Sequence, residues 1–124
     1  MTMLESIAAA RKSGPLPQAD GANLFEFHFG ADEPVFAGHF PGRPILPGIF
    51  QLEMARMAAE NVLRCRLSVR EIIKAKFLSP VLPGETIRLS LKWNNHDGGI
   101  RVSVEFFAAE REVGKAVLQL CRTE

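Results

Sequence analysis

Three prolines, at positions 41, 44 and 47, interrupt the chain just before its only long apolar, helix-favouring stretch. Proline fixes φ and removes a backbone donor, so this segment can neither pair as a central strand nor coil into a helix. It is predicted to be a stiff, extended loop. A helix is predicted to follow at residues 48–64, so the loop delivers His39 close to a helix N-terminus.

The start of this predicted helix is electropositive, because its first amides have no carbonyl partner and the helix dipole favours negative charge there. Glu53 lies five residues after Gly48, on one stripe with Arg56, Glu60 and Arg64. That stripe also fits a solvated face with Glu53–Arg56 and Glu60–Arg64 ion pairs. The helix pattern alone therefore leaves the role of Glu53 open.

The rest of the chain is typical of an antiparallel sheet. Residues 23–29 alternate, with Phe25, Phe27 and Phe29 on one side, which predicts a half-buried strand. Four further strands are predicted after the helix, at 69–78, 86–93, 100–108 and 113–122. In the second of these one face packs and the other is wet, the apolar positions being Ile87, Leu89, Leu91 and Trp93.

The connections carry turn and loop signals. Residues 94–99, Asn-Asn-His-Asp-Gly-Gly, predict a hairpin turn, and 110–114 predict another turn. Residues up to Arg11 are expected to form a short helix, and 13–21, with two prolines, a loop. One long apolar helix with one curved antiparallel sheet is a two-layer α+β arrangement. At 124 residues the chain fits one domain, 1–124.

Composition excludes several classes of function. Fifteen basic residues against fourteen acidic ones give a net charge of +1, which offers no case for nucleic acid. Cys65 and Cys121 fit no metal spacing and are interpreted as packing residues in a reducing compartment. No apolar run approaches the roughly 18 residues of a membrane span, and a cytoplasmic location is expected. His28 and His96 are expected at the surface, without a metal site.

The segment Gly38-His39-Phe40-Pro41 through Pro47-Gly48 and on to Glu53 resembles the signature of the 3-hydroxyacyl-[acyl-carrier-protein] dehydratases of fatty acid synthesis. A second block, Lys-Phe-Leu-Ser-Pro-Val-Leu-Pro-Gly-Glu at 76–85, resembles the strand and Pro-Gly turn that follow the helix in that family. The similarity covers residues 33–122. It implies a hotdog fold, with the sheet wrapped around helix 48–64, and a homodimer joined edge to edge or a higher assembly of dimers.

The resemblance also implies roles for individual residues. His39 matches the catalytic histidine, Glu53 the catalytic acid, and Gly48 the glycine whose amide binds the thioester carbonyl. In the family the histidine and the acid come from different subunits. Further substrate-binding positions are expected at Phe40, Pro47 and Ile49.

Two departures from the family pattern indicate a divergent branch. Met57 stands where the family often has a glutamine that holds the acid, so Arg56 is the candidate to orient Glu53. Residues 1–32 lack the His-Arg-Tyr-Pro-like segment of typical members.

The implied reaction removes water from a 3-hydroxyacyl thioester to give a trans-2-enoyl thioester, in fatty acid or related lipid or polyene synthesis. It requires a base for the proton next to the carbonyl and an acid for the departing hydroxyl. Neutral His39 is a plausible base at physiological pH. Glu53 would have to be protonated, which requires burial among groups such as Ile49, Phe50 and Met57. No metal or organic cofactor is required.

Two alternatives from other classes stay open: a hotdog thioesterase and a non-catalytic acyl-binding subunit. The expected partner is an acyl carrier protein, which is acidic. A basic concentration fits either a solvated face or a docking site for that carrier. Its residues are Arg56, Arg64, Arg66, Arg70, Lys74 and Lys76.

Overall fold

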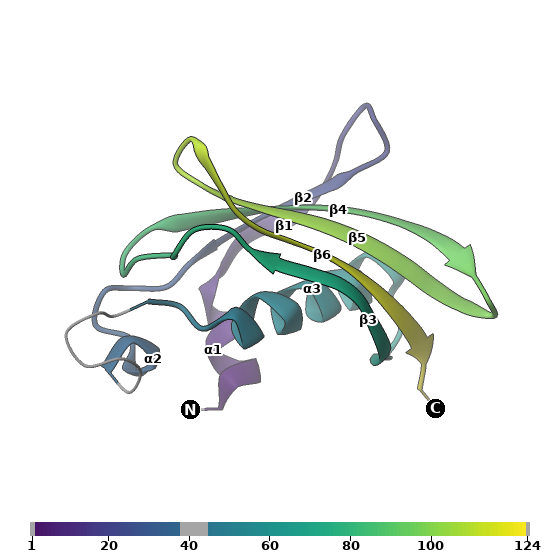
Figure 1. Cartoon of the computed structure of the whole chain (residues 1–124), viewed down its shortest axis with the longest axis horizontal. Coiled ribbons are helices and arrows are strands. Elements are labelled where there is room, and N and C mark those ends of the chain that lie inside the picture. The colour runs from purple at the N-terminus through teal and green to yellow at the C-terminus, as the bar shows by residue number, and fades with distance from the viewer. Residues whose placement is uncertain (1, 38–44, 124) are drawn as a thin grey trace.

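A curved antiparallel sheet of six strands arches over one long helix (Figure 1). The computed structural model describes residues 2–37 and 45–123. The predicted two-layer α+β arrangement is confirmed. The elements in chain order are α1 (Met3–Ala10), β1 (Arg11–Pro17), β2 (Asn23–His28), α2 (Pro34–Ala37), α3 (Gly48–Leu63), β3 (Leu67–Phe77), β4 (Thr86–His96), β5 (Gly99–Ala108) and β6 (Arg111–Arg122).

The strands are ordered β1-β2-β4-β5-β6-β3, so β1 and β3 form the two edges of the sheet. Each neighbouring pair is antiparallel. The register sets Leu89 opposite Phe25 on one side and Phe106 on the other. Residues directly opposite share a face of the sheet, so apolar side chains from three strands form one continuous layer.

Helix α3 packs against this apolar layer because one of its faces carries small and apolar side chains. The buried residues of the helix are Phe50, Gln51, Met54, Ala55, Ala58 and Ala59. On the sheet, Ile87, Leu89 and Leu91 are fully buried, as the alternation predicts. Trp93, on the same parity, is 39% exposed, so the buried part of this face ends before it.

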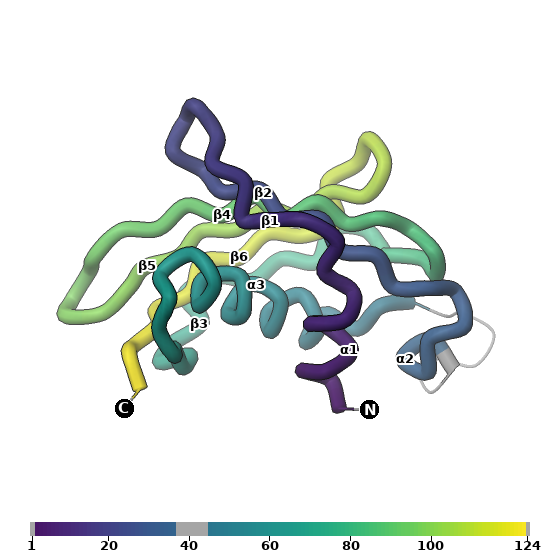
Figure 2. Tube along the Cα trace, turned by 180° about the vertical axis from the view of Figure 1, so that it is seen from behind, coloured from purple at the N-terminus to yellow at the C-terminus, as the bar shows by residue number. Residues whose placement is uncertain are grey.

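Helix α1 covers part of α3 on the side away from β3 (Figure 2). Thr2 caps it: the Thr2 hydroxyl accepts from the Glu5 amide, and the Glu5 carboxylate accepts from the Thr2 amide. This reciprocal capping stabilises a short helix that would be marginal alone. Ile7 then packs into the core and is completely buried.

Three details of the sequence-based prediction are wrong. Residues 13–21 were expected as a loop, yet β1 extends to Pro17. An edge strand tolerates Pro15 and Pro17 because one of its sides has no strand partner, and the pairing with β2 is irregular between Ser13 and Leu16. The short helix α2 was not predicted at all.

The third error concerns turns and helix ends. The hairpin turn predicted over 94–99 is shorter: only Asp97 and Gly98, both with positive φ, separate β4 from β5. The turn predicted over 110–114 is also shorter, because β6 begins at Arg111. At the end of α3, Arg64 adopts the left-handed conformation and its amide donates to the Glu60 carbonyl. The predicted Glu60–Arg64 ion pair is replaced by one between Glu60 and Arg56.

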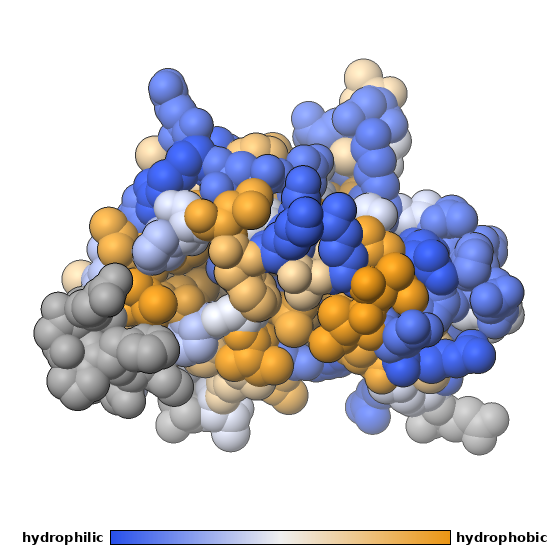
Figure 3. All heavy atoms as spheres, viewed as in Figure 1, coloured by the Kyte–Doolittle hydropathy of each residue, from blue (hydrophilic) through white to orange (hydrophobic). Residues whose placement is uncertain are grey.

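Strand β3 is one of the two edges of the sheet, and most of it is exposed. Only its first residue, Leu67, is buried. Apolar side chains gather on this face of the molecule (Figure 3), among them exposed ones from β3 and the residue after it: Val69, Ile72, Ile73, Phe77 and Leu78. An apolar edge strand with unpaired backbone groups is a template for pairing with another chain. No helix within 2–37 and 45–123 has the length and apolar character needed to span a bilayer.

Candidate active site

The first turn of α3 is fastened in place by backbone contacts. The Leu46 amide donates to the Val81 carbonyl at 2.9 Å, which ties the entry of the helix to the segment after β3. Pro47 is the N-cap, and no side-chain hydrogen bond caps the helix within the described chain. The helix start therefore presents backbone amides and a positive dipole end that no side chain of residues 2–37 and 45–123 satisfies.

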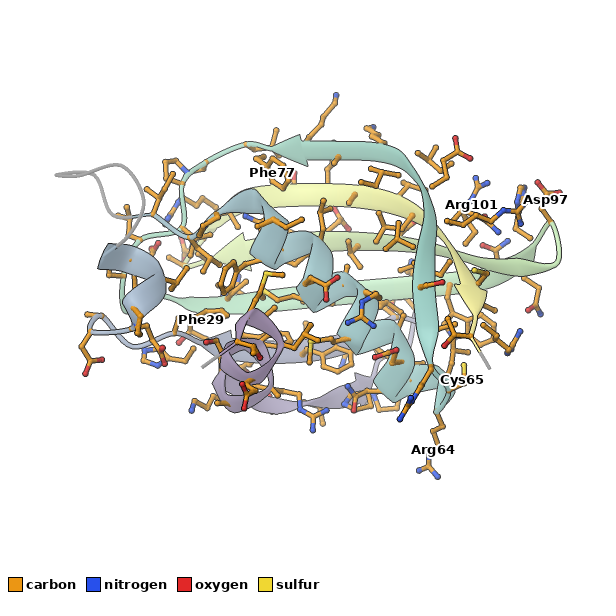
Figure 4. The ribbon with its side chains drawn as sticks, turned by 90° about the horizontal axis from the view of Figure 1, so that it is seen from below. Phe29, Arg64, Cys65, Phe77, Asp97 and Arg101 are labelled. Carbon is orange, nitrogen blue, oxygen red and sulfur yellow. The ribbon has the colours of Figure 1, made fainter. Side chains whose placement is uncertain are left out.

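The ring of Phe77 lies over this helix start (Figure 4). A methyl group on Gly48 would lie 2.7 Å from two carbons of that ring. Position 48 therefore has no room for a side chain while Phe77 keeps its place. This close approach is a structural reason for glycine here, in addition to the amide role that the resemblance implies.

A crevice of about 490 Å³ opens beside the helix start. One wall is the approach to α3 and its first turn, and the other is the segment that follows β3. Its lining is mostly apolar, as suits the acyl part of a ligand. The lining residues are Ile45, Leu46, Pro47, Gly48, Gln51, Phe77, Leu78, Ser79, Pro80 and Val81.

Arg111 forms hydrogen bonds with the segment that follows β3, which is the second wall of the crevice. Its guanidinium donates to both oxygens of Glu85, at 2.6 and 2.8 Å, to the Ser79 hydroxyl at 3.1 Å and to the Pro80 carbonyl at 2.9 Å. The hydrogen bonds that the Glu85 carboxylate accepts from Arg111 lower the pKa of Glu85 from its ordinary value, although desolvation acts to raise it. The segment that closes the crevice is thus tied to the start of β6.

Arg56 organises the carboxylates on the other side of α3. Its Nη2 lies 2.8 Å from Glu53 Oε2, and its Nε donates to both oxygens of the same carboxyl group. Its Nη1 reaches Glu60 at 3.0 Å and the Leu67 carbonyl at 3.2 Å. The side-chain hydrogen bond with Glu53 is the largest cause of a raised Arg56 pKa. Arg56 therefore contacts Glu53 directly, as expected of the residue that the sequence indicates as the candidate to orient it.

Only some of the predicted site residues line the crevice. Pro47 and Gly48 line the crevice together. Glu53 does not line it, because five residues along a helix turn a side chain by about 140° from Gly48. Ile49 is 55% exposed, so the expected apolar enclosure of Glu53 is not complete within one chain. His39 and Phe40 lie outside the described residues.

Sequence reasoning missed Gln51 and Phe77. Gln51 is a polar residue on the stripe that α3 turns towards the sheet, and this mismatch is visible on a helical wheel. Phe77 was assigned only to a strand. Among the described residues, no three His, Cys, Asp or Glu side chains are grouped as a metal site requires.

Comparison with solved structures identifies the fold. One chain of the dehydratase heterocomplex ApeI:P from Xenorhabdus doucetiae superposes with a TM-score of 0.73 at 24% identity, over 90% of this chain and 94% of that one. An uncharacterised protein from Erwinia carotovora superposes with a TM-score of 0.71 at 27% identity, over 91% and 95%. The fold is the hotdog fold, and the expectation from the resemblance is confirmed.

The family follows from the sequence comparisons. The model of the ApeI-like family, described as ApeI dehydratase, matches residues 17–116. The 3-hydroxyacyl-[acyl-carrier-protein] dehydratase FabZ of Desulforamulus reducens is 35% identical over 102 residues, 72% of each chain. The FabZ of Rhodospirillum rubrum is 38% identical over 79 residues, 56% of this chain and 49% of the relative. This chain belongs to the ApeI-like dehydratase family, as a divergent relative of the FabZ enzymes. It spans about half the length of the Rhodospirillum rubrum relative.

Proposed function

We propose that this protein dehydrates 3-hydroxyacyl thioesters, carried on an acyl carrier protein, to trans-2-enoyl thioesters. Membership of the ApeI-like dehydratase family over residues 17–116 carries the proposal. The apolar crevice at the start of α3, where the described residues provide no side-chain cap, supports it, because a thioester carbonyl and an acyl chain need those two environments side by side.

In the proposed reaction His39 removes a proton from the carbon next to the thioester carbonyl. The electron pair moves to the carbonyl oxygen, which the Gly48 amide and the helix dipole stabilise. The pair then returns to form the carbon–carbon double bond, and the C–O bond to the 3-hydroxyl breaks. Glu53 supplies the proton with which that hydroxyl leaves as water.

We propose that the complete site forms between two copies of the chain. Glu53 lies on a different side of α3 from the crevice that contains Gly48, so one chain does not bring the two groups to one substrate. Strand β3 offers an exposed apolar edge to a second β3, and a two-fold axis between such edges gives a closed dimer. Ile49 and Phe77 have the exposure expected of residues that a partner covers.

The contact between Glu53 and Arg56 bears on the acid step. A carboxyl group that donates a proton must first carry one, and a protonated carboxyl cannot make the bidentate ion pair with Arg56 that the structure shows. We propose that this pair opens when the partner subunit and the substrate cover Glu53.

The carrier would dock on the exposed basic residues near the end of α3 and along β3. Arg64, Arg66, Arg70, Lys74 and Lys76 are all exposed. Arg56 does not belong to this surface, because its guanidinium is paired with Glu53 and Glu60. An acidic carrier is attracted to such a surface mainly through a faster, salt-dependent association.

A single assay tests the proposed function. Purified protein is mixed with a 3-hydroxyacyl thioester on acyl carrier protein, and the conjugated enoyl thioester and free thiol are both followed spectroscopically. Dehydration predicts enoyl product without free thiol. Thiol release would identify a thioesterase, and absence of both products would identify a non-catalytic acyl-binding protein.

A further inference from the structure

Two glutamines are buried in this protein, and they differ in one respect. Gln119, 4% exposed, accepts from Arg101 Nε at 2.8 Å and donates to the His96 carbonyl at 2.7 Å. Gln51, 2% exposed, has an Oε1 atom without a hydrogen-bond partner in the part of the chain that the structure describes. A buried acceptor without a partner lowers stability. Such a group in a native protein calls for an explanation, and a functional role is a common one.

The position of Gln51 indicates its role. It lies one helical turn after Gly48 and lines the same crevice. Side chains three residues apart are neighbours on a helix, and long side chains lean towards the N-terminus. The amide of Gln51 is therefore carried back towards the first turn of α3, where the Gly48 amide is.

The orientation of the amide group follows from its contact with β6. The Gln51 Oε1 lies against Gly114, where any side chain at position 114 would collide with it. The Nε2 atom is not among the atoms nearest to that position, whereas Oε1 and Cδ are. Oε1 is therefore the amide atom that lies closer to β6, and Gln51 also borders the crevice.

We infer that Gln51 Nε2 is a second hydrogen-bond donor to the thioester carbonyl oxygen, alongside the Gly48 amide. This inference rests on the proposed function. When the proton next to the carbonyl passes to His39, negative charge develops on that oxygen, and both donors stabilise it until the 3-hydroxyl departs. A glutamine side chain with a backbone amide is a suitable pair of donors, and the apolar lining of the crevice strengthens their effect.

The test compares Gln51→Leu with a matched control, Gln119→Leu, using the 3-hydroxyhexanoyl thioester of N-acetylcysteamine. Loss of one oxyanion donor predicts that Gln51→Leu lowers kcat about a hundredfold with little change in KM. Its Tm should be unchanged or higher, because the unpaired acceptor is gone. Gln119→Leu should show the opposite pattern, a lower Tm with wild-type kcat, because it leaves Arg101 and the His96 carbonyl without their partner.

Several results would overturn the inference. A wild-type kcat in Gln51→Leu, whether or not its Tm is lower, would assign Gln51 to packing alone. A rise in KM without a fall in kcat would place its contact on another part of the substrate. Gln51→Met, which is unbranched and of similar length, provides the same comparison if the leucine variant does not fold.

A binding measurement separates this inference from the proposed function. The hexanoyl thioester of N-acetylcysteamine has the same carbonyl but no hydroxyl to lose, so its affinity is independent of dehydration. If the wild type binds it without dehydrating the hydroxy analogue, and Gln51→Leu binds several-fold more weakly, the inference stands and the proposed function fails. If the wild type dehydrates and Gln51→Leu equals it in kcat and in affinity, the function stands and the inference fails.

Discussion

The ring of Phe77 covers Gly48 so closely that the first residue of α3 cannot carry a side chain without displacing the ring. This contact joins the start of the helix to the end of β3, one of the two edge strands of the sheet. It explains why the two sequence blocks around residues 48 and 77 belong together: they form the two walls of one crevice.

Substitutions at Gly48 should separate the catalytic effect of its backbone amide from the effect of its packing against Phe77. In a Phe77→Ala background, which makes room at position 48, Gly48→Ala keeps the N–H and Gly48→Pro removes it while suiting the first turn of a helix. We expect Gly48→Pro to lower kcat by about a hundredfold or more, since an oxyanion donor is lost. Gly48→Ala in a Phe77→Ala background is the control and should retain more activity. Equal activity of the proline variant and that control would remove the amide from the mechanism.

Arg56 should matter for stability as well as for the position of Glu53. Arg56→Met leaves Glu53, Glu60 and the Leu67 carbonyl without a shared donor in a partly buried site. We expect a loss of about 1–3 kcal/mol in the free energy of unfolding. Arg66→Met, at an exposed position, should stay within about 0.5 kcal/mol of the wild type. Chemical denaturation measures both, and equal values would show that the Arg56 network adds nothing.

The Glu85–Arg111 pair should make stability depend on pH. The pKa of Glu85 is lowered in the folded protein, mainly by its hydrogen bonds with Arg111. The stabilisation is therefore fully present above the unfolded pKa of a glutamate, about 4.3, and is lost as the pH falls through the folded value. We expect the Tm advantage of the wild type over Glu85→Gln to be largest near neutral pH and to shrink on acidification. An advantage that does not change between neutral pH and about pH 3 would contradict this.

Charge reversal should test the proposed carrier surface. Replacing Arg64, Arg66 and Arg70 together by Glu should weaken binding of acyl carrier protein by tenfold or more at low ionic strength. The difference from the wild type should diminish as salt is added, because exposed charges are screened. Turnover of a small thioester without a carrier should be unchanged. Wild-type affinity for the carrier at low salt would leave these arginines as a solvated face.

The sequence predicts this fold well because the alternating pattern of its strands and the apolar pattern of its helix do not conflict. Alternation in residues 23–29 and 100–108, and the apolar run after Pro47, gave strands and a helix close to those observed. Local signals failed where tertiary context decides. The prolines in β1 are accommodated only because that strand lies at an edge, and a short segment such as α2 carries too little pattern to be detected.

Prediction of the candidate site was less complete for a physical reason. Gly48 and Glu53 were proposed from a local motif, and of the two only Gly48 lines the crevice. Phe77, Gln51 and Arg111 act through contacts between segments distant in sequence, such as Gln51 against Gly114 and Arg111 against Glu85. The periodicity of apolar residues indicates which face of a helix or strand is buried, but it does not indicate which residues that face contacts.

Complementation between inactive variants tests the central claim most directly. His39→Ala and Glu53→Gln should each abolish formation of the enoyl thioester while remaining dimeric. When the two variants are mixed and allowed to exchange subunits, some dimers combine an intact His39 from one chain with an intact Glu53 from the other. We predict that the mixture regains part of the wild-type rate. Full activity of either single variant, or no recovery in a mixture shown to contain mixed dimers, would contradict the account.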